Sequence, residues 1–422
     1  MNDPAQRLIA TTVALPEPPD LLAQAGDDGL LFRDEHGGLV GRGEALRIDL
    51  PGGLADPECP ASVARILGDI HTDNPLGLPG TGPVAIGALP FDPTASGQLI
   101  VPRRIFGRSG DVGWLTTVEP YDAGPDPVVL GPTAADCRPP APSVCEPPDE
   151  FRLTPTMTHR EWKEVIGAAV ELLERGDLRK VVLARRIDIG ANRPFVISDV
   201  IERLVALYPS CMVYSVEGFL GASPELLLRR TGDSVESHPL AGTVARSGDT
   251  HGDEVLIAQL MGTPKIRHEH RVVVEAIASA LGPLCSDLDV PDNPSVLGLR
   301  NVSHLATHIT GHLAPGGHAP SALELAARIH PTPAVGGSPT DDAIRYLQKV
   351  EGFERGRYAG PVGWMDARGD GCFALGIRCA EVSGASARIY AGNGIVAGSD
   401  PADELAETQL KLQALLAALV RP

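Results

Sequence analysis

The clearest periodic pattern in the chain lies in residues 158–176. Thr158 is followed three residues later by Glu161, the spacing of a capping box at a helix start. Apolar side chains then recur at the spacing of one helical face, namely Trp162, Ile166, Val170 and Leu173. The pattern predicts an amphipathic helix that ends near Gly176.

β-Branched and alternating apolar residues predict strands in much of the remaining sequence. The run 179–189 indicates a strand whose first part carries Lys180, and a hairpin is expected to turn at Glu217–Gly218 and to be interrupted at Ser223–Pro224. Residues 236–246 contain Gly and Pro and are interpreted as a loop. Further strands are expected at 83–93, 98–106 and 301–313, and as a three-stranded meander in 357–399.

Helical patterns recur between these strands, at 198–208, 253–284 and 321–330. The second is expected to break at Gly262 and Pro264, and the third to stop at Pro331. Because no regular strand-helix alternation appears, we predict an α+β fold with large antiparallel sheets and surrounding helices. Residues 1–150 are expected to form a β-rich portion that ends in a Pro-rich linker, and residues 151–422 the catalytic portion of the same lobed domain.

The composition narrows the class of protein. The chain of 422 residues is 43% hydrophobic and contains 47 Gly and 39 Pro, which indicates a globular protein with many turns. A net charge of −18 argues against nucleic acid or an anionic membrane as the main partner, since both require basic surface. Any pocket for an anion must therefore concentrate Lys, Arg or a metal ion locally.

The cysteines and the N-terminus favour a cytoplasmic protein. The seven cysteines are scattered, odd in number and lack the close spacing of a zinc site, so reduced thiols are expected. The first twenty residues contain acidic side chains and an early proline where a signal peptide has a basic flank and an apolar run. No apolar run approaches the length of a membrane span.

The stretch 391–412 holds the first candidate chemistry. Gly392 and Gly394 precede a helical register that carries Glu404, Glu407 and Lys411 on one face. Two carboxylates side by side suit a hard cation such as Mg²⁺, and a cation beside a lysine suits a substrate with several carboxylates. Taken alone, the same pattern also fits a solvated acidic helix start.

Two charged residues stand next to apolar strands. Lys180 is either an edge-strand lysine that discourages aggregation or a base whose pKa is lowered by its surroundings. Glu225 precedes three leucines and is either a turn residue facing water or a buried general acid with a raised pKa.

Three further residues are candidates. Glu269 lies between His268 and His270, but residues two apart face different sides of a helix, so Glu269 alone is the better metal ligand. His330 precedes Pro331 at a helix stop, where it could simply be a cap. Arg378 is a charge in an otherwise apolar strand, which normally requires an anionic partner.

Taken together and in order, these segments form a recognisable set of motifs. They are KVVLAR from Lys180, SPEL around Glu225, HPLAGT from His238, KxRHEH ending at His270, HPTPA from His330, GxRYAGPVGW from Gly356, IRCA around Arg378, and AGxGIV followed by ExxETxxK. Over residues 155–420 the chain resembles the chorismate-utilising enzymes, whose fold is that of anthranilate synthase component I. PFDP near Phe91 extends the resemblance more loosely towards the N-terminus.

Within that family, HPLAGT and RHEH are most similar to isochorismate synthase. The box typical of anthranilate-type members is absent, and no glutaminase segment is fused to the chain. The resemblance implies a Mg²⁺-dependent isomerisation of chorismate that supplies siderophore or menaquinone biosynthesis. Salicylate synthase, which adds pyruvate elimination, and a non-catalytic chorismate-binding subunit are the alternatives, and a monomer is expected.

The resemblance also implies a role for each site residue. Lys180 would activate the water that adds at C2, and Glu225 would protonate the departing C4 hydroxyl. Mg²⁺ would be held by Glu269 and Glu407, with Glu404 close or linked through water. The enolpyruvyl carboxylate would be bound by Tyr358, Arg378, Lys411 and the backbone at Gly392 and Gly394, and the ring site would be lined by Thr243 and His330.

Two positions depart from the family pattern. Asn393 stands where a small apolar residue is common, and Ile266 where an acidic or polar residue is frequent. Since Asn393 lies in the predicted substrate loop, it could alter the choice of product.

Overall fold

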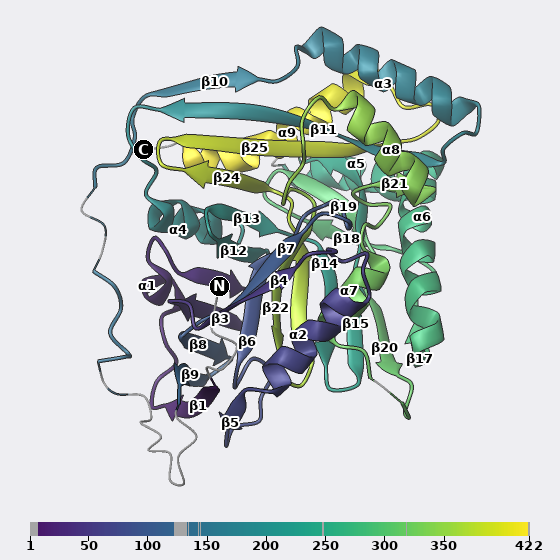
Figure 1. Ribbon diagram of the computed structural model, residues 1–422. Helices are drawn as coiled ribbons and strands as arrows, with labels where there is room; N and C mark the ends of the chain where they lie inside the picture. Colours follow the sequence, from purple (N-terminus) through teal and green to yellow (C-terminus); the bar gives the residue numbers. More distant parts are fainter. Residues whose placement is uncertain are drawn as a thin grey trace.

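The computed structural model describes residues 7–121, 133, 135–141, 143, 145–246, 249–317 and 319–420. Nearly half of the predicted Pro-rich linker, residues 121–150, lies outside these residues. The described chain forms two large sheets, one small sheet and surrounding helices (Figure 1). The predicted α+β class with antiparallel sheets is therefore confirmed. In the described ranges, no helix is long and apolar enough to cross a membrane.

The larger sheet joins strands from the whole length of the chain. Its order is β10 (Phe151–Pro155), β11 (Lys180–Ala191), β25 (Ser386–Ile395), β24 (Cys379–Ser383), β13 (Phe219–Ser223), β12 (Met212–Val216), β2 (Leu30–Arg33), β3 (Gly37–Arg42), β8 (Arg104–Ser109), β9 (Val112–Pro120), β1 (Leu8–Leu15) and β5 (His71–Asp73), with β21 (Gly337–Ser338) paired to β11. Neighbours are antiparallel apart from the parallel pair β1 and β5.

The second large sheet lies against the first. Its order is β17 (Cys285–Asp289), β20 (Ile309–Leu313), β15 (Ser234–His238), β14 (Leu226–Thr231), β23 (Gly371–Leu375), β22 (Pro361–Asp366), β6 (Val84–Ala88), β7 (Gly97–Val101) and β4 (Leu46–Leu50). The small sheet contains β16 (Leu240–Ala245), β19 (Val302–Ala306) and β18 (Ser295–Gly298).

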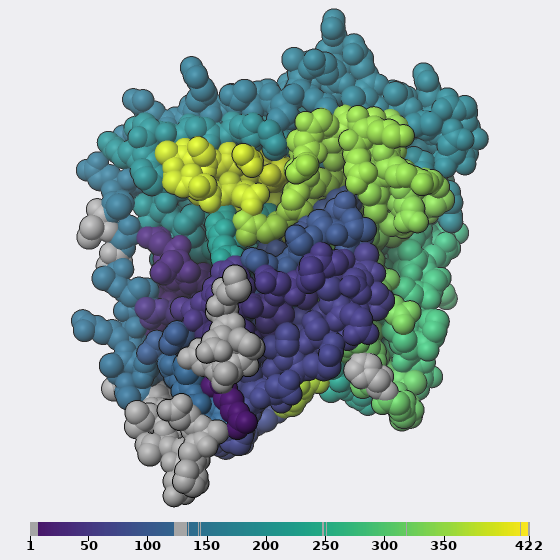
Figure 2. Space-filling view, in the orientation of Figure 1, coloured from purple at the N-terminus to yellow at the C-terminus, as the bar shows by residue number. Residues whose placement is uncertain are grey.

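Strands on both sides of residue 150 share the two large sheets, through the pairs β2 with β12 and β6 with β22. Figure 2 shows the N-terminal residues packed directly against later segments on one face. The division of the chain at residue 150 stays a prediction.

The helices enclose two hydrophobic cores. They are α1 (Leu21–Ala25), α2 (Glu58–Gly68), α3 (His159–Glu174), α4 (Ile197–Leu207), α5 (Thr250–Gly262), α6 (Pro264–Leu281), α7 (Ala322–Ile329), α8 (Thr340–Val350) and α9 (Pro401–Leu419), with a short 3₁₀ turn at Gly282–Leu284. One core combines both large sheets with α2, α3, α6, α7 and α8. The other lies where α1, α4 and α9 cover the larger sheet.

Several local predictions are confirmed. Thr158 and Glu161 form the capping box of α3, and α5 ends at Gly262 before α6 begins at Pro264. The hairpin of β12 and β13 turns at Glu217 and Gly218, which both have positive φ.

Other local predictions are wrong, and each error has a local cause. Residues 236–246 form parts of β15 and β16 instead of a loop. Gly242, at φ +75°, lies where the pairing register of β16 with β19 shifts, as at a β-bulge, so this glycine is accommodated within a strand. The predicted strand 98–106 is divided between β7 and β8 around Pro102, which has no N–H to donate to a ladder.

The C-terminal strands change sheets where we predicted one meander. Residues 357–399 hold four strands, of which β22 and β23 belong to the second sheet and β24 and β25 to the larger one. Similarly, 301–313 divides into β19 and β20 in different sheets. Arg378 lies in the connection between β23 and β24 with φ +49°, and not within a strand.

Candidate active site

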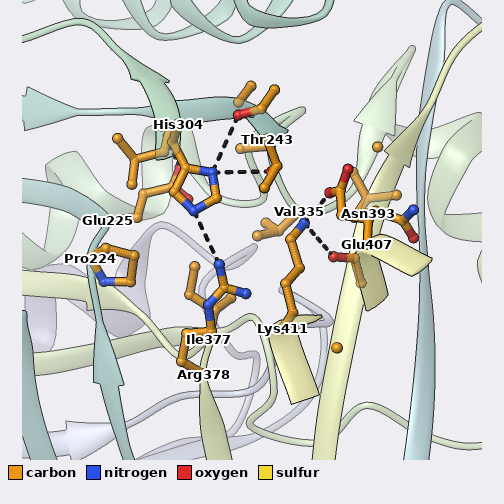
Figure 3. Close-up of a pocket in the computed structure, with 18 of the residues that line it drawn as sticks. Pro224, Glu225, Thr243, His304, Val335, Ile377, Arg378, Asn393, Glu407 and Lys411 are labelled. Atoms are coloured by element: carbon orange, nitrogen blue, oxygen red, sulfur yellow. Dashed lines mark hydrogen bonds and ion pairs between the residues drawn. The ribbon is translucent and has the colours of Figure 1, made fainter. Parts of the chain in front are cut away.

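A cavity opens where the larger sheet, the small sheet and the helices α6 and α9 meet (Figure 3). Most of the residues predicted for the site line it, namely Lys180, Glu225, Thr243, Glu269, Tyr358, Arg378, Gly392, Gly394, Glu407 and Lys411. These residues are far apart in the sequence, so the fold brings the predicted acid, base and anion-binding groups into one space.

Lys180 is a buried residue of the cavity wall, not an edge-strand lysine. β11 pairs with β10, β21 and β25, and the Lys180 side chain is fully buried. Its Nζ lies 3.1 Å from Glu269 Oε1 on α6, yet the contact lacks hydrogen-bond geometry. The Lys180 nitrogen therefore lies beside a carboxylate, but it makes no hydrogen bond to the described residues and can meet a substrate or water.

Gly394 makes the approach of Lys180 and Glu269 possible. A Cβ at this position would lie 2.1 Å from Glu269 Oε1 and 2.7 Å from Lys180 Cε. Such distances are far below van der Waals contact, so any larger residue would displace both charged groups.

Glu225 lies in the connection between β13 and β14 and is 4% exposed. Burial raises the pKa of its carboxyl group to about 7, although the Leu240 N–H, 3.4 Å away, and the charges of Lys180, Lys411 and Arg378 favour the ionised form. A carboxyl group with this pKa can carry a proton near neutral pH and release it to a substrate.

The helix α9 brings a charged pair to the cavity. Lys411 Nζ lies 2.6 Å from Glu407 Oε1 and donates a hydrogen bond of 2.9 Å to the Gly392 carbonyl oxygen. A Cβ at Gly392 would lie 2.7 Å from the Tyr358 hydroxyl oxygen. The glycine therefore allows a helix, a strand and a tyrosine to converge.

His304 is a cavity residue that our sequence reasoning missed. It lies on β19, where its alternating neighbours indicate only a strand, and no local signal distinguishes it. Its Nε2 lies 3.1 Å from Arg378 Nη2, and its Nδ1 lies 3.2 Å from the Gly242 carbonyl oxygen and 3.1 Å from Thr243 Oγ1 (Figure 3).

These partners determine the tautomer of His304. A guanidinium group only donates, so Nε2 accepts from Arg378 and the ring proton sits on Nδ1, which donates to the Gly242 carbonyl. Burial, reinforced by the charges of Arg378 and Lys411, holds the pKa of His304 well below its ordinary value. With Nδ1–H as its neighbour, the Thr243 hydroxyl accepts and keeps its own proton for a ligand.

Arg378 has no carboxylate ion-pair partner among the described residues, because its nearest polar contact is the neutral His304 ring. Burial lowers the pKa of Arg378 from its ordinary value. A desolvated guanidinium without a counterion is a strong attractant for an anionic ligand.

The structure does not place two of the predicted residues in the cavity lining. His330 Nε2 donates to the Phe91 carbonyl oxygen at 2.9 Å, and burial lowers the pKa of the ring to about 4. Ala334 and Val335, a few residues later, line the cavity in its place. Glu404 is buried beside the cavity and accepts from the Asn393 amide.

The donor set for a metal consists of carboxylates. In the part of the chain that the structure describes, no three His, Cys, Asp or Glu side chains form a metal-binding group by themselves. Glu269 and Glu407 nevertheless line the same cavity, and the space that a Cβ at Gly394 would fill lies directly against Glu269. Oxygen ligands of this kind suit a hard divalent cation that completes its shell with substrate or water oxygens.

Comparison with known proteins agrees with this geometry. A family model described as chorismate binding enzyme matches residues 31–420. MenF of Mycobacterium tuberculosis is 39% identical over 355 residues, which cover 81% of this chain and 87% of that protein. The isochorismate synthase DhbC of Bacillus subtilis is 35% identical over 348 residues, covering 80% and 81%. Among solved structures, MenF, the menaquinone-specific isochorismate synthase of Escherichia coli, has a TM-score of 0.79 at 25% identity and covers 99% of this chain and 95% of that one. This chain belongs to the chorismate-binding enzyme family.

Proposed function

We propose that this protein is an isochorismate synthase, which converts chorismate into isochorismate. The observation that carries the proposal is that Lys180 and Glu225 line one cavity together with Arg378, a partly buried cation without a carboxylate partner among the described residues. The names of the relatives support the same reaction.

The reaction requires an acid and a base. A C2–O bond forms as water adds, the double bond shifts, and the C4–O bond breaks as the hydroxyl group leaves. Lys180, acting as a neutral amine, would take a proton from the attacking water, and Glu225 would deliver a proton to the departing hydroxyl, which leaves as water. Because the pKa of Glu225 is about 7, this residue is protonated often enough near neutral pH to act as the acid.

The remaining cations and donors would hold the substrate. Arg378, Lys411 and Tyr358 would bind the enolpyruvyl carboxylate with the backbone at Gly392 and Gly394. Thr243 would donate its free hydroxyl proton at the ring, with Ala334 and Val335 completing the wall where we had expected His330. All of these residues line the cavity except His330, whose ring donates a hydrogen bond to the Phe91 carbonyl oxygen outside the cavity lining.

Glu269 and Glu407 would hold Mg²⁺, which would supply positive charge that grips the ring carboxylate. Their carboxylates face the cavity and provide the oxygen ligands that this cation prefers. Glu404 is one helical turn before Glu407 but is engaged by Asn393 behind the cavity wall.

Incubation of the purified protein with chorismate and Mg²⁺, followed by chromatographic separation of the products, tests the function. We expect isochorismate, loss of turnover in EDTA, and recovery with added Mg²⁺. Salicylate and pyruvate as the main products would show a salicylate synthase instead. No turnover under any metal condition would show a non-catalytic binding subunit.

Two variants test the roles. Lys180→Ala and Glu225→Gln should each lower kcat by about 10²- to 10⁴-fold, the usual contribution of a positioned acid or base. Retention of the wild-type rate by either variant would show that the substituted residue is not the base or acid proposed here.

Two further experiments test the oligomeric state and the pathway. Light scattering of the purified protein tests the predicted monomer. Deletion of the gene followed by metabolite analysis tests whether the product supplies siderophore or menaquinone synthesis.

A further inference from the structure

Asn393 occupies an unusual place in the cavity wall. It lies on β25 between Gly392 and Gly394 and is 1% exposed. A Cβ at either glycine would contact cavity groups, Tyr358 at position 392 and Glu269 at position 394. Since successive strand residues point to opposite faces, the Asn393 side chain leaves on the far side, towards α9.

The Asn393 amide holds the first turn of α9. Its Nδ2 donates to the main-chain oxygen of Glu404 at 3.0 Å and also to Glu404 Oε2. Because a main-chain carbonyl only accepts, this contact determines which way the amide points. Asn393 Oδ1 is buried without a hydrogen-bond partner among the described residues.

An unpartnered buried oxygen costs stability, so packing alone does not account for an asparagine here. An apolar side chain of similar shape would fill the space without that cost. The role of Asn393 is therefore the hydrogen bonding of its amide nitrogen to Glu404.

The contact continues to a second helix. Glu404 Oε1 lies 3.5 Å from Lys265 Nζ on α6. Lys265 is four residues before Glu269, and Glu404 is three residues before Glu407, so each stands one turn from a cavity carboxylate on the same face of its helix. The chain of contacts from Asn393 through Glu404 to Lys265 thus joins β25 to both carboxylate-bearing helices.

We propose that Asn393, Glu404 and Lys265 form a bridge that sets the separation of Glu269 and Glu407 for a divalent cation. In this arrangement Glu404 is a positioning residue and not a metal ligand. The inference rests on the proposed function, because it assumes that Glu269 and Glu407 bind the cation. It assigns to Asn393, one of the two departures from the family pattern, an effect on metal affinity in place of product choice.

Direct metal binding tests the bridge. Mn²⁺, whose free form is measured by electron paramagnetic resonance, is titrated into wild-type protein, Asn393→Ala and the matched control Asn301→Ala. Asn301 Nδ2 also donates to a main-chain oxygen of α9, that of Leu410 at 2.8 Å, but within the described ranges its side chain makes no hydrogen bond to α6 or to the cavity carboxylates. We expect Mn²⁺ affinity about tenfold weaker in Asn393→Ala, as for other residues that orient metal ligands, and unchanged in Asn301→Ala.

Kinetics and a surface variant complete the test. The Mg²⁺ concentration for half-maximal rate should rise in Asn393→Ala, while kcat at saturating Mg²⁺ stays near the wild-type value. Lys265→Met removes a positive charge, which by electrostatics alone would tighten cation binding, whereas the bridge predicts weaker binding. A protein that carries both substitutions should bind Mn²⁺ no more weakly than the single variant with the larger loss of affinity, because both substitutions break the same bridge.

The outcomes separate the two claims. Equal Mn²⁺ affinities for Asn393→Ala and Asn301→Ala, or tighter binding by Lys265→Met, would overturn the bridge and leave the enzyme assignment intact. A wild-type protein that binds no Mn²⁺ and turns over chorismate in EDTA would overturn both the metal assignment and the bridge. If Asn393→Ala does not fold, the partly exposed Lys265→Met still decides the question by its sign.

Discussion

Arg378 Nη2 lies 3.1 Å from His304 Nε2, so a cavity arginine is oriented by a neutral histidine and not by a carboxylate. A carboxylate would neutralise the guanidinium, whereas the imidazole leaves its charge available to a substrate anion. The Gly242 carbonyl, bound to the other ring nitrogen, keeps the imidazole in the required tautomer.

Substitution of His304 should therefore impair substrate binding. We expect His304→Ala to lower kcat/KM about 10- to 100-fold, mainly through KM, because a hydrogen bond to a charged group is lost. His312→Ala, which removes an exposed histidine paired with Asp287, serves as the control and should behave as wild type. Steady-state kinetics with chorismate decides the point, and an unchanged KM in His304→Ala would contradict it.

Glu225 should make activity depend on pH. As a general acid it must be protonated, and its pKa is about 7, so kcat should fall as pH rises through that value. A rate that stays constant from pH 6 to pH 9 would show that another group supplies the proton.

The same burial should make stability depend on pH. The pKa of Glu225 is raised from 4.5 in the unfolded chain to about 7, so the stabilising effect of the neutral form is complete below pH 4.5 and is lost as pH rises through 7. Relative to Glu225→Gln, the wild-type protein should lose about 3 kcal/mol between pH 4.5 and pH 8. Urea unfolding of both proteins without Mg²⁺ at several pH values measures this difference, which should be absent if Glu225 ionises normally.

Gly394 should tolerate no side chain. Because its Cβ would lie 2.1 Å from Glu269 Oε1, Gly394→Ala should displace Glu269 and Lys180 and lower kcat about 100-fold or more. Gly190→Ala on the paired strand, where nothing lies within 4 Å of the added carbon, is the matched control. Equal activity of the two variants would show that the cavity adjusts to the methyl group.

Arg355 should stabilise the cavity wall. It pairs with buried Glu351 and donates to the carbonyl oxygens of Val182 at 2.6 Å and Val335 at 2.7 Å, both cavity residues. Arg355→Ala should lower the free energy of unfolding by about 3–5 kcal/mol, because Glu351 is left buried without its partner. Arg65→Ala, which breaks an exposed pair with Glu58, should change it by less than about 0.5 kcal/mol in the same denaturant titration.

Local structure could be predicted from the sequence where a few neighbouring residues decide it. The Thr158 and Glu161 cap, the helix break at Gly262 and Pro264, and the turn at Glu217 and Gly218 all depend on contacts within one turn of chain. The motifs around Lys180, Glu225 and Lys411 likewise identified residues that share one cavity.

Tertiary structure decided what depends on distant partners. Whether Gly242 marks a loop or a bulge depends on its pairing with β19, and strand patterns do not show which sheet a strand joins. His304 enters the site through contacts 61 and 74 residues away in sequence, with Thr243 and Arg378. His330 and Glu404 are of the same residue types as His304 and Glu407, which line the cavity. Their side chains lie outside the cavity lining and instead form hydrogen bonds with Phe91 and Asn393. A sequence specifies which chemical groups are present, but burial and the geometry of nonlocal contacts determine which of them face the substrate.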